Sequence, residues 1–254
     1  MKLHQTIIGK GPTLVLLHGW GFNCKIWSPL IPLLKEKYTL HLLDLPGFGN
    51  SVELPNPYTL PQTAEVILEN TPPEAIYCGW SMGGLISIYI AIHHSHRVHQ
   101  LITVSASPCF IQKTDWPGVP VEMLEKFSEE LIEDYKKTIK QFILLQFYQT
   151  ETPKAEIRQL IDSVLNAPIP PKKALLGGLS ILKESDLRAD LNKISCPQNY
   201  IFGKLDRLAP ATTEKPLRKL LPQADISVID GTSHAPFLSN PREFLKVTGL
   251  TDNA

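Results

Sequence analysis

Residues 78–85 read CGWSMGGL and place a serine, Ser81, in the pattern Gly-x-Ser-x-Gly. Such a serine can attack an ester carbonyl if a histidine removes its proton and a carboxylate orients that histidine. The pattern alone is weak, because chance supplies it in roughly one ordinary chain in ten to twenty at a background glycine usage of about 7%. The alternative is a turn of small residues that happens to contain a serine.

Two later residues complete the arrangement that such a serine needs. His234 lies in GTSHAPF, just past an apolar run that ends at Asp230, and Asp206 lies in IFGKLDRLAP, shortly after a run that ends at Phe202. Open α/β sheets carry their active sites at such strand ends, and the order serine, aspartate, histidine is that of nucleophile-elbow enzymes. We therefore predict Ser81 as nucleophile, His234 as base and Asp206 as the group that orients it.

Other residues compete for these roles. The rival carboxylates are Asp186, Asp190, Asp225 and Asp230. Asp225 suits the start of a strand, and Asp230 is too near His234 in sequence to approach it easily from a neighbouring strand. Four further histidines are expected to be surface or core residues: His93, His94, His96 and His99.

Acyl transfer also needs N–H donors for the charge that develops on the carbonyl oxygen. One is expected from the backbone of Met82, directly after the serine. The other is expected from Trp20 in HGWG, a loop shaped by His18 and Gly19 after an apolar run. The alternative is that HGWG is only a glycine turn.

Cofactor and metal motifs are weak. LDLPGFGNS at residues 43–51 has the spaced glycines of a phosphate loop but lacks the Gly-Lys-Ser/Thr ending, so a structural turn is favoured. The cysteines show no Cys-x-x-Cys spacing and are expected to be buried free thiols: Cys24, Cys78, Cys109 and Cys196. We expect neither a metal nor an organic cofactor.

The elements that must position these residues follow from hydrophobic patterning. Continuous apolar runs, typical of strands buried on both faces of a parallel sheet, occur at 13–18, 38–45, 75–79, 101–106, 199–203 and 225–230. Helix-length segments such as 61–70 and 83–94 separate them. This rhythm predicts an α/β fold with a mostly parallel sheet and helices on both faces.

The strand rhythm stops near Ile111 and resumes near residue 199. Between them the pattern is helical, with Ile139, Phe142, Ile143 and Gln146 at spacings of three and four. We therefore expect a core formed by residues 1–111 and 188–254, interrupted by a helical cap at 112–187.

Composition excludes several classes of protein. The 254 residues include 25 Lys+Arg and 25 Asp+Glu, so no global field favours nucleic acid or an anionic membrane. The sequence contains neither a signal-peptide core nor a run of about 18 apolar residues. We expect a cytoplasmic protein, and a monomer.

Five stretches carry a resemblance to a known family: HGWG, DLPGFGNS, GWSMGG, FGKLDRLAP and SHAPF. With these motifs the chain resembles the α/β-hydrolase family. SASPCF, DWPG, FILLQ, GGLSILKESDLR and HAPFLSNP narrow the resemblance to a cap-bearing carboxylesterase branch of biotin synthesis. That branch acts on the methyl ester of a pimeloyl chain held by acyl-carrier protein, which is the activity that the resemblance implies here.

The resemblance also implies residue roles. Ser81, Asp206 and His234 match the catalytic positions, and Trp20 and Met82 match the oxyanion site. The acyl channel would be lined by Phe142, Ile143, Leu144, Leu145 and Gln146. The carrier protein would meet basic cap residues, namely Lys137, Lys140, Lys154 and Arg158, whereas Gln141 departs from the basic pattern.

Charge in the cap supports a docking surface but also has a simpler explanation. Residues 136–158 hold five basic and two acidic side chains, whereas residues 122–134 hold six acidic side chains and only Lys126 as a base. The lysines could merely solvate helix faces. Two other functions remain open: a generalist carboxylesterase or other cap-bearing serine hydrolase, and a catalytically silent binding protein. The second is disfavoured because all three candidate catalytic residues are present.

Overall fold

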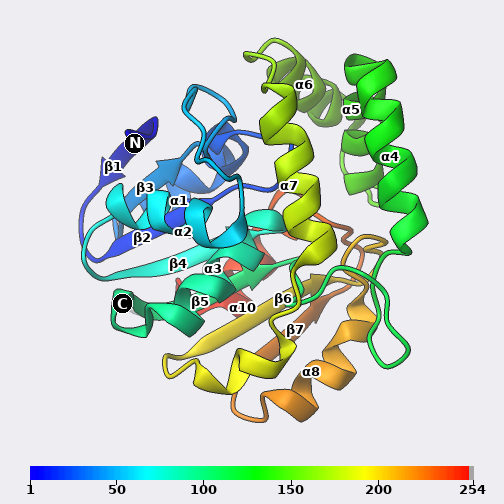
Figure 1. Cartoon of the computed structure of the whole chain (residues 1–254). Coiled ribbons are helices and arrows are strands. Elements are labelled where there is room, and N and C mark those ends of the chain that lie inside the picture. The colour runs from blue at the N-terminus through cyan, green and yellow to red at the C-terminus, as the bar shows by residue number, and fades with distance from the viewer. Residues whose placement is uncertain (252–254) are drawn as a thin grey trace.

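The structure is a computed structural model that describes residues 1–251. Within these residues a single sheet has the strand order β1-β3-β2-β4-β5-β6-β7 (Figure 1). Its strands are β1 (Gln5–Gly9), β2 (Thr13–Leu17), β3 (Thr39–Leu43), β4 (Ala75–Trp80), β5 (Val98–Val104), β6 (Gln198–Gly203) and β7 (Asp225–Ile229). Every neighbouring pair is parallel except β1 with β3. The predicted α/β class with a mostly parallel sheet is confirmed.

The six strands predicted from apolar runs are all present, with ends shifted by a few residues. All six residues of β4 are buried, which explains why its sequence is apolar without alternation. The edge strand β1 was not predicted. Four of its five residues are exposed, so its sequence has no buried face to reveal it.

Helices of the core pack beside the sheet. They are α1 (Ile31–Leu34), α2 (Leu60–Glu69), α3 (Met82–His93), α8 (Glu214–Leu220), α9 (Pro236–Ser239) and α10 (Pro241–Thr248). Short 3-10 helices cover Cys24–Leu30, Ser95–Arg97, Arg188–Lys193 and Ala211–Thr213. The helix that follows β4 is buried along nearly its whole length, including Leu85, Ile86 and Ile90, and only Tyr89 and His93 near its end are more exposed. Such a helix belongs to the interior and fixes the position of its own first turn.

A helical segment interrupts the sheet between β5 and β6. In this fully described stretch the helices are α4 (Val121–Glu133), α5 (Tyr135–Gln146), α6 (Lys154–Leu165) and α7 (Lys172–Glu184), coloured green to yellow in Figure 1. The chain leaves and re-enters the core at adjacent points. Cys109 and Asp186 form an isolated antiparallel β-bridge, and the Leu187 N–H donates to the Pro108 carbonyl at 2.9 Å. We propose that 112–187 is a cap unit on the core 1–111 and 188–254.

Two further expectations concern cysteines and membranes. Cys24, Cys78 and Cys109 are buried free thiols, whereas Cys196 is only partly buried. Burial raises the pKa of the Cys24 thiol to about 12, with the neighbouring Asp44 charge acting in the same direction.

Among residues 1–251 no helix is both long enough and apolar enough to span a membrane.

The turn between β4 and α3 depends on glycine. A Cβ atom on Gly83 would overlap the backbone carbonyl oxygens of Leu17 and His18, and one on Gly79 would overlap the backbone of Gly83. Neither obstacle is a flexible side chain that could move aside. The glycines therefore let α3 begin directly against the end of β2.

We predict that Gly83→Ala destabilises the protein. The added methyl group must displace the β2 backbone, so the free energy of unfolding should fall by about 1–3 kcal/mol. Urea denaturation followed by circular dichroism measures this change. In an unobstructed helix the same substitution would stabilise by roughly 0.5–1 kcal/mol, so an increased urea midpoint would contradict the packing argument.

Candidate active site

Ser81 lies at the turn between β4 and α3 in a strained backbone conformation. Its φ of 54° and ψ of −118° fall in a region that non-glycine residues rarely adopt. Such strain costs about 1–3 kcal/mol and persists only where the surrounding structure enforces it. Here the Ser81 N–H donates to the Val104 carbonyl at 2.9 Å, and α3 is buried behind it. The turn presents the serine hydroxyl at the beginning of α3.

The structure brings Ser81, His234 and Asp206 into one hydrogen-bonded chain. Ser81 Oγ lies 2.9 Å from His234 Nε2, and His234 Nδ1 lies 2.8 Å from Asp206 Oδ2. All three residues are buried, with 6%, 1% and 6% of their surface exposed for Ser81, His234 and Asp206. Ser81 and His234, which are 153 positions apart in the sequence, therefore meet in a buried site together with Asp206.

Neighbouring groups fix the orientation of this chain. Asp206 Oδ1 accepts hydrogen bonds from the N–H groups of Leu208 at 2.8 Å and Ala209 at 3.0 Å, which leaves Oδ2 for the histidine. Because a carboxylate only accepts, His234 Nδ1 must carry the proton, and Nε2 is free to accept from the serine. Trp80 Nε1 donates to the His234 carbonyl at 2.7 Å and holds its backbone. The arrangement can therefore take the proton of Ser81 as the hydroxyl attacks.

None of the rival aspartates is hydrogen-bonded to His234. Asp225 and Asp230 are exposed at the two ends of β7, Asp186 pairs with Arg188, and Asp190 pairs with Lys193. The histidines after the serine are peripheral: His93, His96 and His99 are exposed, and His94 lies 3.2 Å from Glu65. The geometry thus favours Asp206 and His234 over these alternatives.

Trp20 and Met82 adjoin the serine. Met82 is the first residue of α3, and the HGWG loop is so close that a Cβ on Gly19 would lie 3.1 Å from the Ser81 Cβ. Within residues 1–251 neither backbone N–H has a hydrogen-bond partner. Unpaired N–H groups at a helix start suit a developing negative charge. They remain our predicted oxyanion donors.

The Trp20 side chain joins the loop to the cap. Its indole Nε1 donates to the Leu175 carbonyl on α7 at 2.9 Å. Its ring makes edge-to-face contacts with Phe127 on α4 and Phe142 on α5, at centroid distances of 5.3 and 5.5 Å. One residue of the core thus contacts three cap helices beside the serine.

His18 stabilises the same loop from within. It is fully buried, its Nε2 accepts from the Leu45 N–H at 2.9 Å, and its Nδ1 lies 2.8 Å from the Gly19 carbonyl. Because Nε2 accepts, Nδ1 carries the proton and donates to Gly19. Burial lowers the pKa of His18, so the side chain is held neutral.

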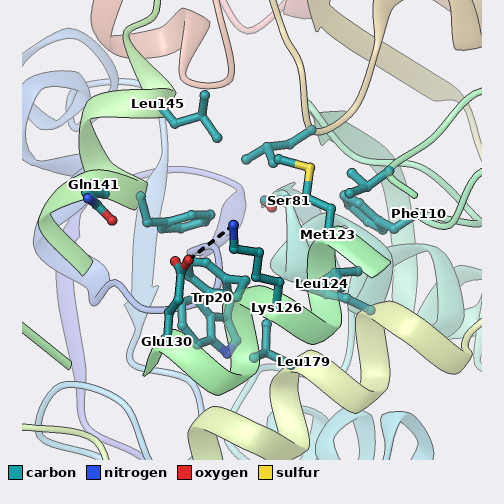
Figure 2. Close-up of a pocket in the computed structure, with 15 residues that line it drawn as sticks. Trp20, Ser81, Phe110, Met123, Leu124, Lys126, Glu130, Gln141, Leu145 and Leu179 are labelled. Atoms are coloured by element: carbon teal, nitrogen blue, oxygen red, sulfur yellow. Dashed lines mark ion pairs between the residues drawn. The ribbon is translucent and has the colours of Figure 1, made fainter. Parts of the chain in front are cut away.

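An apolar cavity of about 390 Å³ opens from Ser81 between the core and the cap (Figure 2). Trp20, Phe142 and Leu145 are among the residues that line it. The structure adds residues that the sequence did not single out: Phe110, Val119, Met123, Leu124, Phe127, Leu179, Leu182 and Leu208. The segments VEMLEKFSEEL and GGLSILKE carry apolar residues at helical spacing, and this pattern could have indicated several of these residues from the sequence.

Three residues of the predicted channel lining do not face this cavity. Ile143 and Gln146 are fully buried beside the cavity, and Leu144 points to solvent. Phe142 and Leu145 share a helix face, whereas the Gln146 side chain turns back and donates to the Phe142 carbonyl at 2.8 Å. Met82 and His234, which the resemblance also implies as substrate-binding residues, are buried and are not among the residues that line the cavity.

The predicted basic residues are exposed on adjacent cap helices. Lys137 and Lys140 belong to α5, and Lys154 and Arg158 belong to α6. Among the described residues none of these four side chains takes part in an ion pair. Their charge is therefore available to a partner.

The segment 43–51 forms a structural turn. Asp44 is buried and accepts from the N–H groups of Cys24 at 2.7 Å and Asn50 at 2.9 Å, and from His4 Nδ1. Asp44, Cys24 and His4 place their potential metal-ligand atoms within 4.8 Å of one another. The carboxylate is already occupied by N–H donors and the thiol is kept protonated, so this cluster suits a hydrogen-bonded turn better than an ion.

Comparison with known proteins identifies the family of the chain. A family model described as the α/β hydrolase fold matches residues 12–241. The chain belongs to the α/β-hydrolase family. Within the family it is 40% identical to an Aeromonas hydrophila protein named pimeloyl-[acyl-carrier protein] methyl ester esterase, over 97% of this chain and 98% of that protein. It is 42% identical to a protein of the same name from Yersinia enterocolitica, over 96% and 94% of the two chains.

Two solved structures share the fold of this chain. An esterase from Exiguobacterium antarcticum superposes with a TM-score of 0.87 at 24% identity, covering 97% of this chain and 94% of that one. An enol-lactonase from Burkholderia xenovorans gives a TM-score of 0.83 at 21% identity, covering 99% and 96%. At this level of identity the likeness shows the fold alone.

We predict that Asp206→Asn lowers kcat for p-nitrophenyl acetate by about three to four orders of magnitude. An asparagine in that place can hold the wrong histidine tautomer, which has an effect of this size in serine hydrolases. Ser81→Ala should abolish turnover while leaving the circular dichroism spectrum unchanged. Asp225→Asn, which alters an exposed rival carboxylate, is the matched control and should keep wild-type activity. Less than tenfold loss in Asp206→Asn would remove Asp206 from the site.

Stability should depend on pH through His18. Below about pH 6.5 a histidine in the unfolded chain takes up a proton, whereas buried His18, whose pKa is lowered, does not. The free energy of unfolding should therefore fall as pH drops from 7 to 5.5, by up to about 1.4 kcal/mol per unit. Burial lowers the pKa of His41 as well and adds in the same direction. Urea titrations at several pH values measure how the free energy of unfolding changes with pH. His96→Gln, at an exposed site, is the control and should keep the wild-type dependence on pH. A wild-type free energy of unfolding that does not change between pH 7 and 5.5 would refute the role of His18.

Proposed function

We propose that this chain is a serine carboxylesterase that hydrolyses the methyl ester of pimeloyl-[acyl-carrier protein], releasing pimeloyl-[acyl-carrier protein] and methanol in biotin synthesis. The observation that carries the proposal is the hydrogen-bonded chain from Ser81 through His234 to Asp206 at the inner end of an apolar cavity. Nearly full-length relatives of the stated name, about 40% identical, supply the substrate class.

In the first half of the proposed reaction Ser81 Oγ attacks the ester carbonyl carbon while its proton moves to His234 Nε2. The carbonyl electron pair moves to oxygen, which the N–H groups of Trp20 and Met82 stabilise. When this pair returns, the bond to the methoxy oxygen breaks and methoxide leaves with the proton from His234 as methanol. An acyl group remains on Ser81.

In the second half a water molecule replaces the alcohol. It loses a proton to His234 Nε2 and attacks the acyl carbon, and collapse of the intermediate breaks the bond to Ser81 Oγ. The serine recovers its proton from His234, and the carboxylic acid is released. Every proton in this scheme moves through His234, and the steps require neither metal nor organic cofactor.

The cavity supports a long apolar acyl group. Its volume of about 390 Å³ lies within the range of small-molecule sites, and aromatic and aliphatic side chains line it almost throughout. Burial of methylene groups contributes about 0.8 kcal/mol each. A chain of several methylenes would therefore bind more tightly than a short acyl group.

The exposed basic residues support presentation by an acidic carrier protein. Lys137, Lys140, Lys154 and Arg158 lie on two neighbouring helices and are free of ion pairs among the described residues. Positive charge beside a cavity raises the rate of encounter with a negatively charged partner. We propose that this surface receives the carrier, and that the protein acts as a cytoplasmic monomer.

Carrier recognition should be separable from ester chemistry. We predict that the triple variant Lys137→Glu, Lys154→Glu and Arg158→Glu lowers the ratio of kcat/KM for methyl pimeloyl-carrier protein to that for free dimethyl pimelate by about tenfold or more. Each exposed pair contributes roughly 0.2–1 kcal/mol, and reversal replaces attraction by repulsion.

The matched control reverses three exposed lysines on α8 and α10, namely Lys215, Lys219 and Lys246. This control variant carries the same net charge as the cap variant and should keep the wild-type ratio of the two kcat/KM values. If wild-type enzyme shows no preference for the carrier-bound ester, and the cap variant changes nothing, the chain is a generalist carboxylesterase.

A further inference from the structure

The cavity has polar groups at its two ends and apolar walls between them. Ser81 forms the buried inner end. At the outer end the lining residues include Lys126 and Glu130 on α4 and Gln141 on α5 (Figure 2). The Lys126 and Glu130 side chains are 77% and 43% exposed. The cavity therefore runs from a reactive hydroxyl to a polar rim at the surface.

Lys126 and Glu130 are the only charged residues among the described side chains that line this cavity. Their charged atoms lie 3.8 Å apart, one helical turn from each other on α4. This distance exceeds that of a hydrogen bond, so the ammonium group keeps donors for another acceptor. Glu130 attracts the ammonium group of Lys126 to the rim but does not accept a hydrogen bond from it.

The apolar walls make the rim selective. Phe127, Phe142 and Leu145 lie along the cavity, so a bound chain meets no polar partner between Ser81 and the rim. A chain with a polar group at only one end would leave the Lys126 donors to water. A chain with a second carbonyl at its far end could accept a hydrogen bond there. The polarity of the cavity thus fits a chain with an acyl carbon at each end.

We propose that Lys126 is a specificity-determining residue that donates a hydrogen bond to the far carbonyl oxygen of a dicarboxylic acyl chain whose ester carbonyl lies at Ser81. This inference rests on the proposed function and deepens it. In a carrier-bound substrate the far carbonyl is that of the thioester; in a free diester it is the second ester group. The residue selects the chain by both its ends rather than by apolar length alone.

The test compares two methyl esters with acyl chains of equal length. Dimethyl pimelate has a far carbonyl, whereas methyl heptanoate ends in a methyl group. For Lys126→Met, which keeps an unbranched apolar stem but removes the donor, the ratio of kcat/KM for dimethyl pimelate to that for methyl heptanoate should fall about threefold to tenfold, mainly through KM. Lys126→Arg, which keeps a cationic donor, should hold the ratio within about twofold of wild type.

The matched control is Lys183→Met. Lys183 also pairs with a glutamate of α4, Glu125, at 2.6 Å, but does not line the cavity. Loss of this pair tests whether any weakening of α4 changes the ratio, and no change is expected. An unchanged ratio in Lys126→Met, or an equal fall in Lys183→Met, would overturn the assignment.

Wild-type turnover of methyl pimeloyl-carrier protein is measured in parallel and separates the two proposals. If this ester is hydrolysed but Lys126→Met keeps the wild-type ratio, only the role of Lys126 is lost. If wild-type enzyme does not hydrolyse the carrier-bound ester, the proposed function itself fails, whatever Lys126 does with the free diester.

Discussion

The strained turn at Ser81 is the constraint on which the rest of the site depends. A left-handed φ at a serine is unfavourable by itself, and it persists because α3 is buried and starts against the β2 backbone. The same close approach brings the HGWG loop beside the serine. One packing arrangement therefore fixes the hydroxyl, the start of the helix and the loop with the second N–H. His18 then holds that loop by two hydrogen bonds from inside the core.

Much of the fold could be predicted because a parallel sheet leaves a strong signal. Strands such as β4 are buried on both faces and read as continuous apolar runs, and the residues that follow them collect at one edge of the sheet. That geometric rule led to Asp206 and His234 without any knowledge of their distance. The exposed edge strand β1 pairs only with β3, so no burial pattern marked it in the sequence.

The cavity wall was less predictable, for a physical reason. Helical spacing in a sequence shows which residues share a face of a helix. It does not show whether that face packs against the protein interior or lines a cavity. Phe142 meets the cavity, whereas Ile143 meets the protein interior, although both are apolar and adjacent. The hydrogen bond that turns Gln146 back on its own helix is equally invisible in a sequence. Residues fixed by strand ends are thus easier to predict than residues fixed by packing between helices.

The proposed core and the proposed cap contribute different parts of the site. In the proposed reaction the core supplies the hydroxyl of Ser81, the base His234 and the carboxylate of Asp206, which all follow strands of the sheet and could serve any ester. Most of the cavity wall comes instead from α4, α5 and α7, which touch the core loop through Trp20. Substitutions on these helices can alter the rim and wall without moving the serine. Substrate choice can therefore change while the chemistry is retained, and a likeness of fold to esterases and lactonases does not fix the substrate.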